Sequence, residues 1–348
     1  MKPIVVFSVL IRLDGGGAER SAARLVEPLA GKGVTLNRYA IDPLWSGEES
    51  AGGTTLLPDS RRGVKRLLTA AVNLAAAVRR GSPDVVHLNC EAPEIVGLIT
   101  KALTLNQRYG LVITNHHMKA WHGLRAPLGT VVRVIYKAFG AVYVNCYKDD
   151  GQGGKVPVIY NPTGVLLPLK PDLKKHRRLV VIGRLIDRKR VDDILMAAGA
   201  AGWRDEVIIV GAGPEAIRLQ ALAIDLGLNA TFLGHRKDPW EVVQENDIFV
   251  TASSSEGEPL TLIEALQRDL PVLASEIPAH LRVLGRHPGL FGSTSELALR
   301  FTEVLQDSKI SESLKLPGPA RSALLMERDP ELIASQWTAL YRTLARSS

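Results

Sequence analysis

Short apolar runs alternate with amphipathic stretches along the first half of the chain. The apolar runs are short and bounded by polar residues, as buried strands are; they are Ile4–Leu10, Val85–Leu88, Leu111–Thr114 and Ala141–Asn145. The stretches between them repeat apolar residues at helical spacing; they cover Ala18–Gly31, Val64–Arg80, Ala92–Leu105 and Thr130–Phe139. Strands that alternate with helices in this way predict a doubly wound parallel sheet with both faces covered.

The same alternation begins again in the second half. The predicted strands are Leu179–Ile182, Glu206–Val210, Thr231–Leu233, Asp247–Val250 and Pro271–Ala274. The predicted helices are Arg190–Ala201, Pro214–Leu226, Trp240–Gln244, Leu260–Arg268 and Glu296–Leu305. A proline-rich and then charged segment, residues 161–172, is typical of a linker between domains. We therefore predict an α/β protein of two Rossmann-like domains, residues 1–165 and 166–330, whose sheets face each other across a cleft.

The end of the chain predicts one more helix. Ile333, Trp337, Leu340, Tyr341 and Leu344 are spaced as one helical face, and the segment follows an Asp-Pro pair that favours a helix start. We expect this helix, residues 331–348, to return to the first domain and to help form the hinge.

Composition narrows the class of protein. Hydrophobic residues make up 46% and charged residues 23% of the 348 residues, as in a protein with a proper core. The two cysteines, Cys90 and Cys146, are far apart, so neither a disulfide framework nor a zinc knuckle is expected. The apolar start ends in a glycine turn, unlike a signal peptide, and no apolar run reaches the roughly 20 residues of a membrane span. We expect a cytoplasmic protein.

The net charge of +7 is unevenly distributed. Residues 1–165 hold 20 Lys and Arg against 12 Asp and Glu, whereas the remaining residues hold 23 against 24. The basic first half favours an anionic partner, such as a phosphate-bearing acceptor or a membrane surface, and solvated charge without a partner is the alternative.

The first motif with chemical meaning is a glycine turn. Gly15, Gly16 and Gly17 follow a predicted strand and open a helix, so the free N–H groups there favour a phosphate or another anion. The turn lacks the GxGxxG form, so the dinucleotide fingerprint is absent, and a plain tight turn is the alternative.

The second motif is the basic turn after the strand at 179–182. Arg184 and Lys189 lie five residues apart across it, which lets both point at one anion. A bidentate guanidinium and a mobile ammonium suit a diphosphate. Exposed charge is the alternative, and it is the interpretation that we give to Arg188 and Arg190.

The third motif begins at Ser253 and holds two glutamates eight residues apart. Glu256 lies in the turn after a strand, and Glu264 lies about one turn into the next helix. A helix-borne carboxylate can accept hydrogen bonds from the hydroxyls of a ribose, and the loop carboxylate can hold a hexose.

Taken together, these motifs resemble glycosyltransferase family four, whose members have the two-domain GT-B fold. The GGAER turn, the GRL…K turn, the VGAGPE turn and the SxxEGxPLxxxEAL segment occur in the family's order over nearly the whole chain. The resemblance implies a retaining, metal-independent glycosyltransferase. Its substrate would be a nucleotide-diphosphate sugar, most simply a UDP-sugar, bound by the second domain, with the acceptor bound by the first and no cofactor.

The resemblance also implies roles for single residues. Arg184 and Lys189 would bind the diphosphate, Glu264 the ribose and Glu256 the donor sugar. His116 would lie at the donor sugar, with His117 as the alternative. The residues implied at the donor are Gly15, Gly16, Gly17, Gly183, Arg184, Lys189, Gly234, His235, Glu256, Gly257, Glu258, Pro259, Leu260 and Glu264, and those implied in catalysis are Arg184, Lys189, Glu256 and His116.

Two positions depart from the family pattern. Glu258 stands where the family has an aromatic or aliphatic residue, which puts the identity of the donor sugar in doubt. Asp269 stands where glycine is common, and we expect it to alter a turn rather than the chemistry.

The acceptor is not indicated by the sequence. A lipid-linked glycan, with peripheral membrane contact through the basic first domain, and a soluble small molecule both fit; nucleic acid is not expected. The alternative functions are a sugar-nucleotide epimerase or hydrolase of the same fold and a catalytically silent nucleotide-binding protein. A metal site is not expected.

Overall fold

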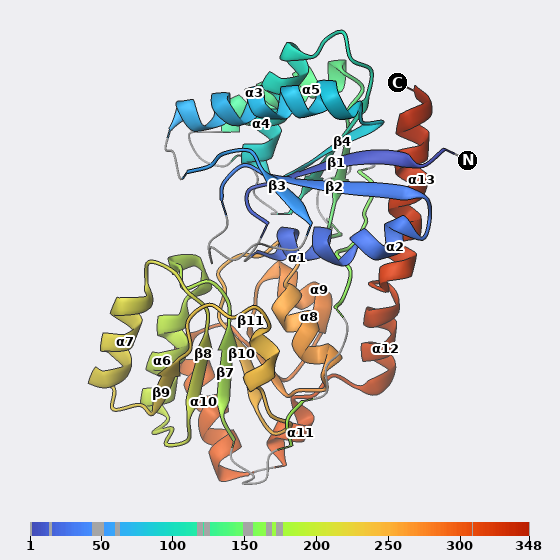
Figure 1. Ribbon diagram of the computed structural model, residues 1–348. Coiled ribbons are helices and arrows are strands. Elements are labelled where there is room, and N and C mark those ends of the chain that lie inside the picture. Colours follow the sequence, from blue (N-terminus) through green and yellow to red (C-terminus); the bar gives the residue numbers. More distant parts are fainter. Residues whose placement is uncertain are drawn as a thin grey trace. The chain divides into compact units, whose positions relative to one another are not determined.

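The structure, a computed structural model, describes residues 2–13, 16–43, 52–59, 63–116, 121, 126–148, 156–164, 169–171, 177–307 and 309–347. The chain forms two compact units. Unit 1 consists of residues 1–163 together with 327–348, and unit 2 of residues 164–326. Each unit is built around one parallel sheet (Figure 1).

Unit 1 has a six-stranded sheet with the order β3-β2-β1-β4-β5-β6. Its strands are β1 (Ile4–Leu10), β2 (Val34–Ala40), β3 (Gly53–Thr55), β4 (Val85–Asn89), β5 (Gly110–Asn115) and β6 (Val142–Asn145). Its helices are α1 (Gly17–Arg24), α2 (Val26–Ala30), α3 (Val64–Gly81), α4 (Glu91–Leu103), α5 (Ala126–Ala138) and α13 (Pro330–Ser347).

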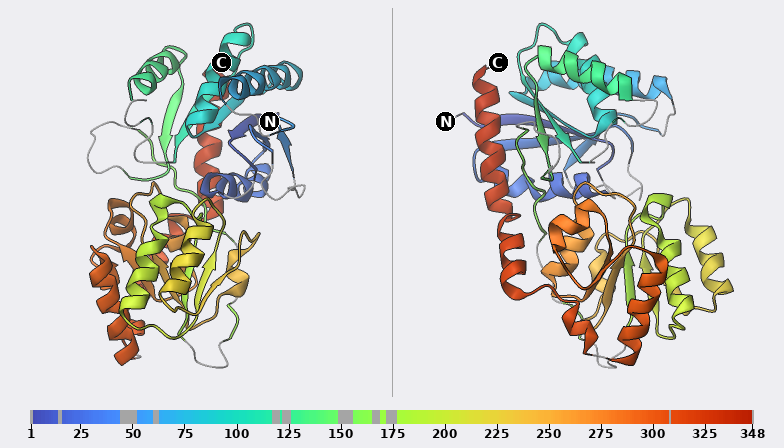
Figure 2. Two further views of the ribbon diagram at one scale, coloured as in Figure 1. Left: turned by 90° about the vertical axis from the view of Figure 1, so that its left-hand side faces the viewer. Right: turned by 180° about the vertical axis from the view of Figure 1, so that it is seen from behind.

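Alternate residues of each strand of unit 1 point to opposite faces of the sheet, and both faces are buried. Phe7, Val86 and Ile113 point to the face covered by α3, α4 and α5, which lie beside one another in Figure 2. Val6 and Val112 point to the other face, together with residues of α13. The near-continuous apolar runs of β1, β4 and β5 follow from this double burial.

Helix α13 packs on the sheet of unit 1, although more than 300 residues separate it from β1. Trp337 stacks on Tyr341 with ring centroids 5.5 Å apart, and both are nearly fully buried. The Tyr341 hydroxyl lies 2.8 Å from Nδ1 of His87 in β4. Helix α13 also lies close to the backbone of β5. A Cβ added to Gly110 would come only 2.7 Å from the Cβ of Leu344, so only glycine fits at this position.

Unit 2 repeats the strand order of unit 1, as β12-β11-β10-β7-β8-β9. Its strands are β7 (Leu179–Ile182), β8 (Val207–Val210), β9 (Ala230–Phe232), β10 (Ile248–Thr251), β11 (Val272–Ser275) and β12 (Leu290–Phe291). Its α-helices are α6 (Val191–Ala200), α7 (Ala216–Asp225), α8 (Leu260–Gln267), α9 (Pro278–Leu284), α10 (Thr294–Gln306), α11 (Ile310–Ser313) and α12 (Gly318–Met326), and its 3-10 turns are η2 (Asp187–Lys189) and η3 (Pro239–Val242).

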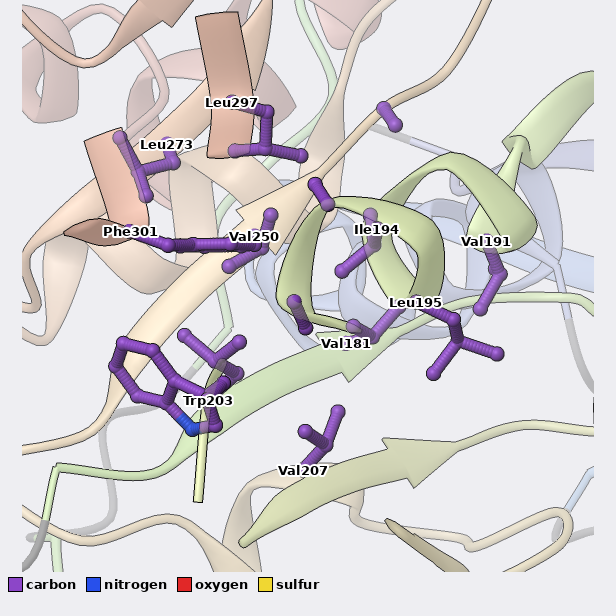
Figure 3. Close-up of a cluster of buried hydrophobic side chains, with 14 of the residues drawn as sticks. Val181, Val191, Ile194, Leu195, Trp203, Val207, Val250, Leu273, Leu297 and Phe301 are labelled. Carbon is purple, nitrogen blue, oxygen red and sulfur yellow. The ribbon is translucent and has the colours of Figure 1, made fainter. Parts of the chain in front are cut away.

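One core of unit 2 lies between its sheet and helices α6, α7 and α10. Val181, Ile194 and Phe301 meet there from a strand and two helices (Figure 3). Trp203 is 1% exposed beside Phe301, with ring centroids 5.5 Å apart. The indole N–H of Trp203 has no hydrogen-bond partner among the described residues, so this tryptophan serves packing alone.

The predicted elements are found with three kinds of difference. The helix predicted over Ala18–Gly31 is interrupted at Leu25, because Pro28 has no N–H to donate to the carbonyl four residues before it. The helix predicted over Trp240–Gln244 is a single 3-10 turn that ends before Val243, whose backbone is extended. The strands β2, β3 and β12 were not predicted, since Asn37 and Arg38 interrupt the apolar pattern of β2 and the other two strands are only three and two residues long. The helices α9, α11 and α12 were not predicted either.

Candidate functional site

The motifs of unit 2 converge because of the order of its strands. The strand order reverses between β7 and β10, which are neighbours in the sheet. The basic turn follows β7 and the segment from Ser253 follows β10, so both lie at the carboxyl edge where open α/β sheets bind ligands.

Lys189 and Glu256 form an ion pair across this edge. The Lys189 Nζ lies 2.5 Å from Oε1 of Glu256, and their side chains are only 17% and 10% exposed. Ser253 donates from its hydroxyl to the same carboxylate oxygen at 2.8 Å. The guanidinium of Arg188 lies 4.0 Å from the other oxygen of Glu256. The sequence suggests that Arg188 is only a solvated neighbour, and the structure places it beside the ion pair instead.

The ionic environment keeps Glu256 charged. Burial alone raises the pKa of this carboxyl, but the nearby Lys189 ammonium lowers it, and Arg188 and Ser253 act in the same direction. The net effect is a pKa below the ordinary value for glutamate. The site therefore presents a fixed carboxylate beside a fixed ammonium, a pair that can hold both a sugar hydroxyl and a phosphate oxygen.

The two loops that carry this pair are tied together through their backbones. The N–H of Ser254 donates to the carbonyl of Arg188 at 2.9 Å, and the guanidinium of Arg188 donates to the carbonyl of Ser255 at 3.1 Å. Behind them, Ser275 donates from its hydroxyl to the carbonyl of Ser253 at 2.7 Å. Hydrogen bonds to the main-chain carbonyls of Arg188 and Ser255 therefore link the loops that carry Lys189 and Glu256.

Glycines bring the loop after β8 into contact with the loop after β7. A Cβ on Gly211, which has φ of +152°, would lie 1.8 Å from the carbonyl oxygen of Gly183. A Cβ on Gly213 would lie 2.1 Å from the carbonyl oxygen of Leu185. The backbone N–H of Gly211 also donates to the carbonyl of Gly234 at 2.8 Å. The VGAGPE turn therefore needs glycine at both positions for backbone packing, whatever it binds.

Glu264 is held by a tryptophan that sequence reasoning missed. It is 2% exposed on α8, and its Oε2 accepts the indole N–H of Trp240 at 2.9 Å. The guanidinium of Arg268 lies 4.4 Å above the Trp240 ring and donates to the Glu264 carbonyl. Trp240 directly follows the loop that begins at Gly234, and nothing in the sequence pairs it with Glu264.

The remaining predicted residues of unit 2 line the same edge. Arg184 is exposed after β7, five residues before Lys189, and that the two cations bind one anion stays a prediction. His235 is exposed beside Gly234, which has φ of +65°. Glu258 is half-buried between the buried Gly257 and Pro259, and Leu260 begins α8.

His280 lies in the interior of unit 2 near the same ion pair. It is fully buried at the start of α9, and its Nδ1 donates to the carbonyl of Ser275 at 2.8 Å. Burial lowers the pKa of His280 to about 4. It therefore stays neutral at pH 7 and forms part of the wall behind Ser275.

Asp269 adopts φ of +59°, the left-handed region that favours glycine. It forms an ion pair with Arg321 of α12. The departure from the family's glycine therefore falls on a turn after α8, as the sequence suggests.

In unit 1 the carboxyl edge carries His116. Its Nε2 lies 3.2 Å from Oδ1 of Asn89, a residue that the sequence analysis did not select. The amide nitrogen of Asn89 donates to the hydroxyl of Ser8 and to the carbonyl of Val9, which orients Oδ1 toward His116. The Asn89 oxygen therefore favours the tautomer of His116 with hydrogen on Nε2.

The glycine turn is described only in part. Gly16 caps α1 and Gly17 begins it, and a Cβ on Gly16 would meet the carboxylate of Glu19. Gly15 and the alternative His117 lie outside the described residues. A carboxylate already lies at this helix start, which weakens the expectation of a phosphate there.

A small cavity of about 20 Å³ lies beneath His116 in unit 1, large enough for one water molecule. His87 lines it and accepts or donates hydrogen bonds with Tyr341 at 2.8 Å and with Thr114 at 2.6 Å. Burial lowers the pKa of His87 to about 3, so this histidine is a neutral structural residue at pH 7.

The described part of the chain contains no cluster of three or more His, Cys, Asp or Glu residues arranged to hold a metal ion. None of its helices is long and apolar enough to cross a membrane.

Family comparison agrees with the two units. Residues 15–162 match the family described as Glycosyltransferase Family 4, and residues 170–318 match the family described as Glycosyl transferases group 1. The chain belongs to the family-four glycosyltransferases, with the GT-B fold.

Individual relatives are distant. A lipopolysaccharide 1,6-galactosyltransferase of Salmonella typhimurium is 30% identical over 147 residues, which make up 39% of this chain and 41% of that protein. The match therefore spans less than half the length of this curated relative.

Among solved structures, a sucrose-phosphate synthase of Thermosynechococcus elongatus aligns over all of both chains with a TM-score of 0.76 and 18% identity. Anabaena HepE in complex with UDP and glucose aligns over 98% of this chain and all of its own, with a TM-score of 0.75 and 17% identity. These likenesses concern the fold.

Proposed function

We propose that the protein transfers a sugar from a UDP-sugar to an acceptor hydroxyl, with retention of configuration and without a resident metal ion. The observation that carries the proposal is the ion pair between Lys189 and Glu256, at the point where the strand order of unit 2 reverses. The complex of HepE with UDP supports uracil as the base.

The chemistry of each group fits this reaction. The Lys189 ammonium has three donors, so it can keep one on Glu256 and direct another to a phosphate oxygen. Arg184, exposed on the same turn, adds a bidentate donor. These cations stabilise the charge that develops on the leaving diphosphate, the task that a metal ion performs in other enzymes.

The transfer step needs no protein nucleophile. The bond between the anomeric carbon and the phosphate oxygen breaks, and its electron pair leaves with UDP. The acceptor oxygen forms the new bond on the face that UDP leaves, and its proton passes to a phosphate oxygen of the departing UDP. Glu256 holds a hydroxyl of the donor sugar, and Glu264 holds the ribose.

The test is a set of UDP-sugars assayed for binding by thermal shift and for UDP release with and without candidate acceptors. A product with the same anomeric configuration as the donor supports the proposal. Inversion would contradict the retaining mechanism. A free sugar or an epimerised nucleotide sugar as the sole product, with every acceptor, would instead support the hydrolase or epimerase alternative.

We expect transfer to survive a strong chelator, because Lys189 and Arg184 can neutralise the leaving diphosphate as a metal ion would. The measurement is UDP release before and after dialysis against EDTA, with a known metal-dependent glycosyltransferase as the control. Activity that disappears and returns with one divalent ion would show that the diphosphate is held differently.

The Trp240→Phe variant should bind UDP-sugar more weakly while it keeps its fold. Phenylalanine retains the aromatic packing but cannot donate to Glu264. Glu264, the carboxylate proposed to hold the ribose, therefore loses its orientation. The lost charge-assisted hydrogen bond corresponds to about 1.5–3 kcal/mol, or at least about tenfold in KM, with a smaller effect on kcat.

The matched control is Trp203→Phe, which removes an indole N–H that has no hydrogen-bond partner among the residues described. It should leave the KM for the donor unchanged. Equal KM values in both variants and the wild type would mean that Trp240 does not position Glu264 for binding.

A further inference from the structure

Exposed apolar side chains of unit 1 are concentrated on one face. Of the eleven large hydrophobic residues that are exposed in the described part of this unit, nine lie on or directly after α3, α4 and α5. They are Val64, Leu68, Val72, Leu103, Leu105, Leu128, Val131, Val134 and Phe139. The helices of the opposite face contribute Leu332 alone among the described residues.

The apolar residues follow the helical repeat. Val64, Leu68 and Val72 are spaced four residues apart on α3 and are 47–71% exposed. Leu128, Val131 and Val134 are spaced three apart on α5 and are 52–64% exposed. Residues at these spacings lie on the same side of a helix, so each helix has an outward apolar stripe besides its buried one.

Cations accompany these stripes. Lys65, Arg79 and Arg80 are exposed on α3, and Arg133 and Lys137 are exposed on α5. Neither helix contains an aspartate or a glutamate. Helices α3 and α5 lie in one row with α4 between them (Figure 2), so the charges and the stripes share one layer.

We propose that the outer surface of α3, α4 and α5 docks on an anionic lipid bilayer. Apolar side chains on basic amphipathic helices enter the headgroup region, while lysine and arginine contact the lipid phosphates. The two glutamates of α4, Glu91 and Glu94, are half-buried and buried, so the exposed charges on the three helices are cations. A mainly apolar protein partner would not need this surplus of positive charge, so charge complementarity favours the membrane. The surface would bring the protein to a lipid-borne acceptor, and it goes beyond the proposed transfer reaction.

The experiment is co-sedimentation of the full chain with vesicles of phosphatidylcholine mixed with phosphatidylglycerol, and with vesicles of phosphatidylcholine alone. Binding is expected to the anionic vesicles only and to weaken with salt. The triple variant Val64→Ser/Leu68→Ser/Val72→Ser should lower the vesicle-bound fraction at least about tenfold. Lys65→Glu/Lys137→Glu should lower it by about tenfold or more.

The matched control is Ile217→Ser/Ile224→Ser/Leu299→Ser, which removes three apolar side chains that are 63–81% exposed on helices of unit 2. It should bind vesicles like the wild type. All variants should keep the wild-type thermal shift with UDP, which separates this proposal from the proposed function. The proposal would be overturned if the wild-type protein did not bind anionic vesicles, or if the control variant lost vesicle binding to the same extent as the α3 variant. It would also be overturned if light scattering showed that the wild-type protein self-associates and the α3 variant does not, because the surface would then bind a second copy of the chain.

Discussion

The Arg184→Ala and Lys189→Ala variants should each lose nearly all sugar transfer. Each removes a cation from the turn after β7, and each should weaken binding of the diphosphate by about 1.5–3 kcal/mol, the scale of a charge-assisted hydrogen bond. The measurements are UDP affinity by calorimetry and UDP release under saturating acceptor.

The two variants should differ in stability. Arg184 is exposed, so its removal leaves the unfolding free energy of unit 2 nearly unchanged. Lys189 neutralises Glu256, whose side chain is 10% exposed, so Lys189→Ala leaves a buried carboxylate without its main partner and destabilises unit 2 as well. Arg204→Ala, an exposed arginine before β8, is the control and should retain activity. Wild-type turnover in a folded Arg184→Ala/Lys189→Ala variant would refute the assignment.

Removal of the residues after Pro330 should destabilise unit 1 and abolish transfer. The truncation exposes the core face that Ile333, Trp337, Tyr341 and Leu344 cover, and it leaves Nδ1 of His87 without Tyr341. Unit 2 has its own sheet and cores, so it should still bind the nucleotide.

A single substitution gives a milder form of the same test. Trp337→Ala should lower the unfolding free energy of unit 1 by about 3–5 kcal/mol, the usual loss for a buried aromatic side chain. Leu332→Ala, 44% exposed on the same helix, should change it by less than about 1 kcal/mol. Urea unfolding followed by tryptophan fluorescence and circular dichroism measures both. A truncated protein with unchanged melting temperature and turnover would show that α13 is not part of the fold of unit 1.

The sequence predicts most of the strands because both sheets are buried on both faces. Runs such as Leu179–Ile182 contain no polar residue, so their strand assignment needs no knowledge of neighbours. Strand β2 was missed because Asn37 and Arg38 interrupt its apolar pattern. Arg38 is nevertheless buried, although a charged residue predicts an exposed position.

The motifs of the candidate site can be recognised in the sequence, but the contacts between its residues cannot. Spacing along the chain puts Lys189 on one turn with Arg184, and the structure adds an ion pair with Glu256, 67 residues away. That contact depends on β7 and β10 being neighbours, which strand order decides and local sequence does not. Trp240 and Asn89 were missed for the same reason, since each acts on a residue of a different element.

The backbone packing around Gly211 and Gly213 has a consequence for how donor preference can evolve. These glycines join the loops of unit 2 main chain to main chain, so replacing either one displaces a whole loop. Glu258, in contrast, is a half-buried side chain on the loop in which Ser253 donates to Glu256. If the proposed donor site lies at this edge, laboratory libraries aimed at donor preference should vary Glu258 and His235 while they leave the glycines intact.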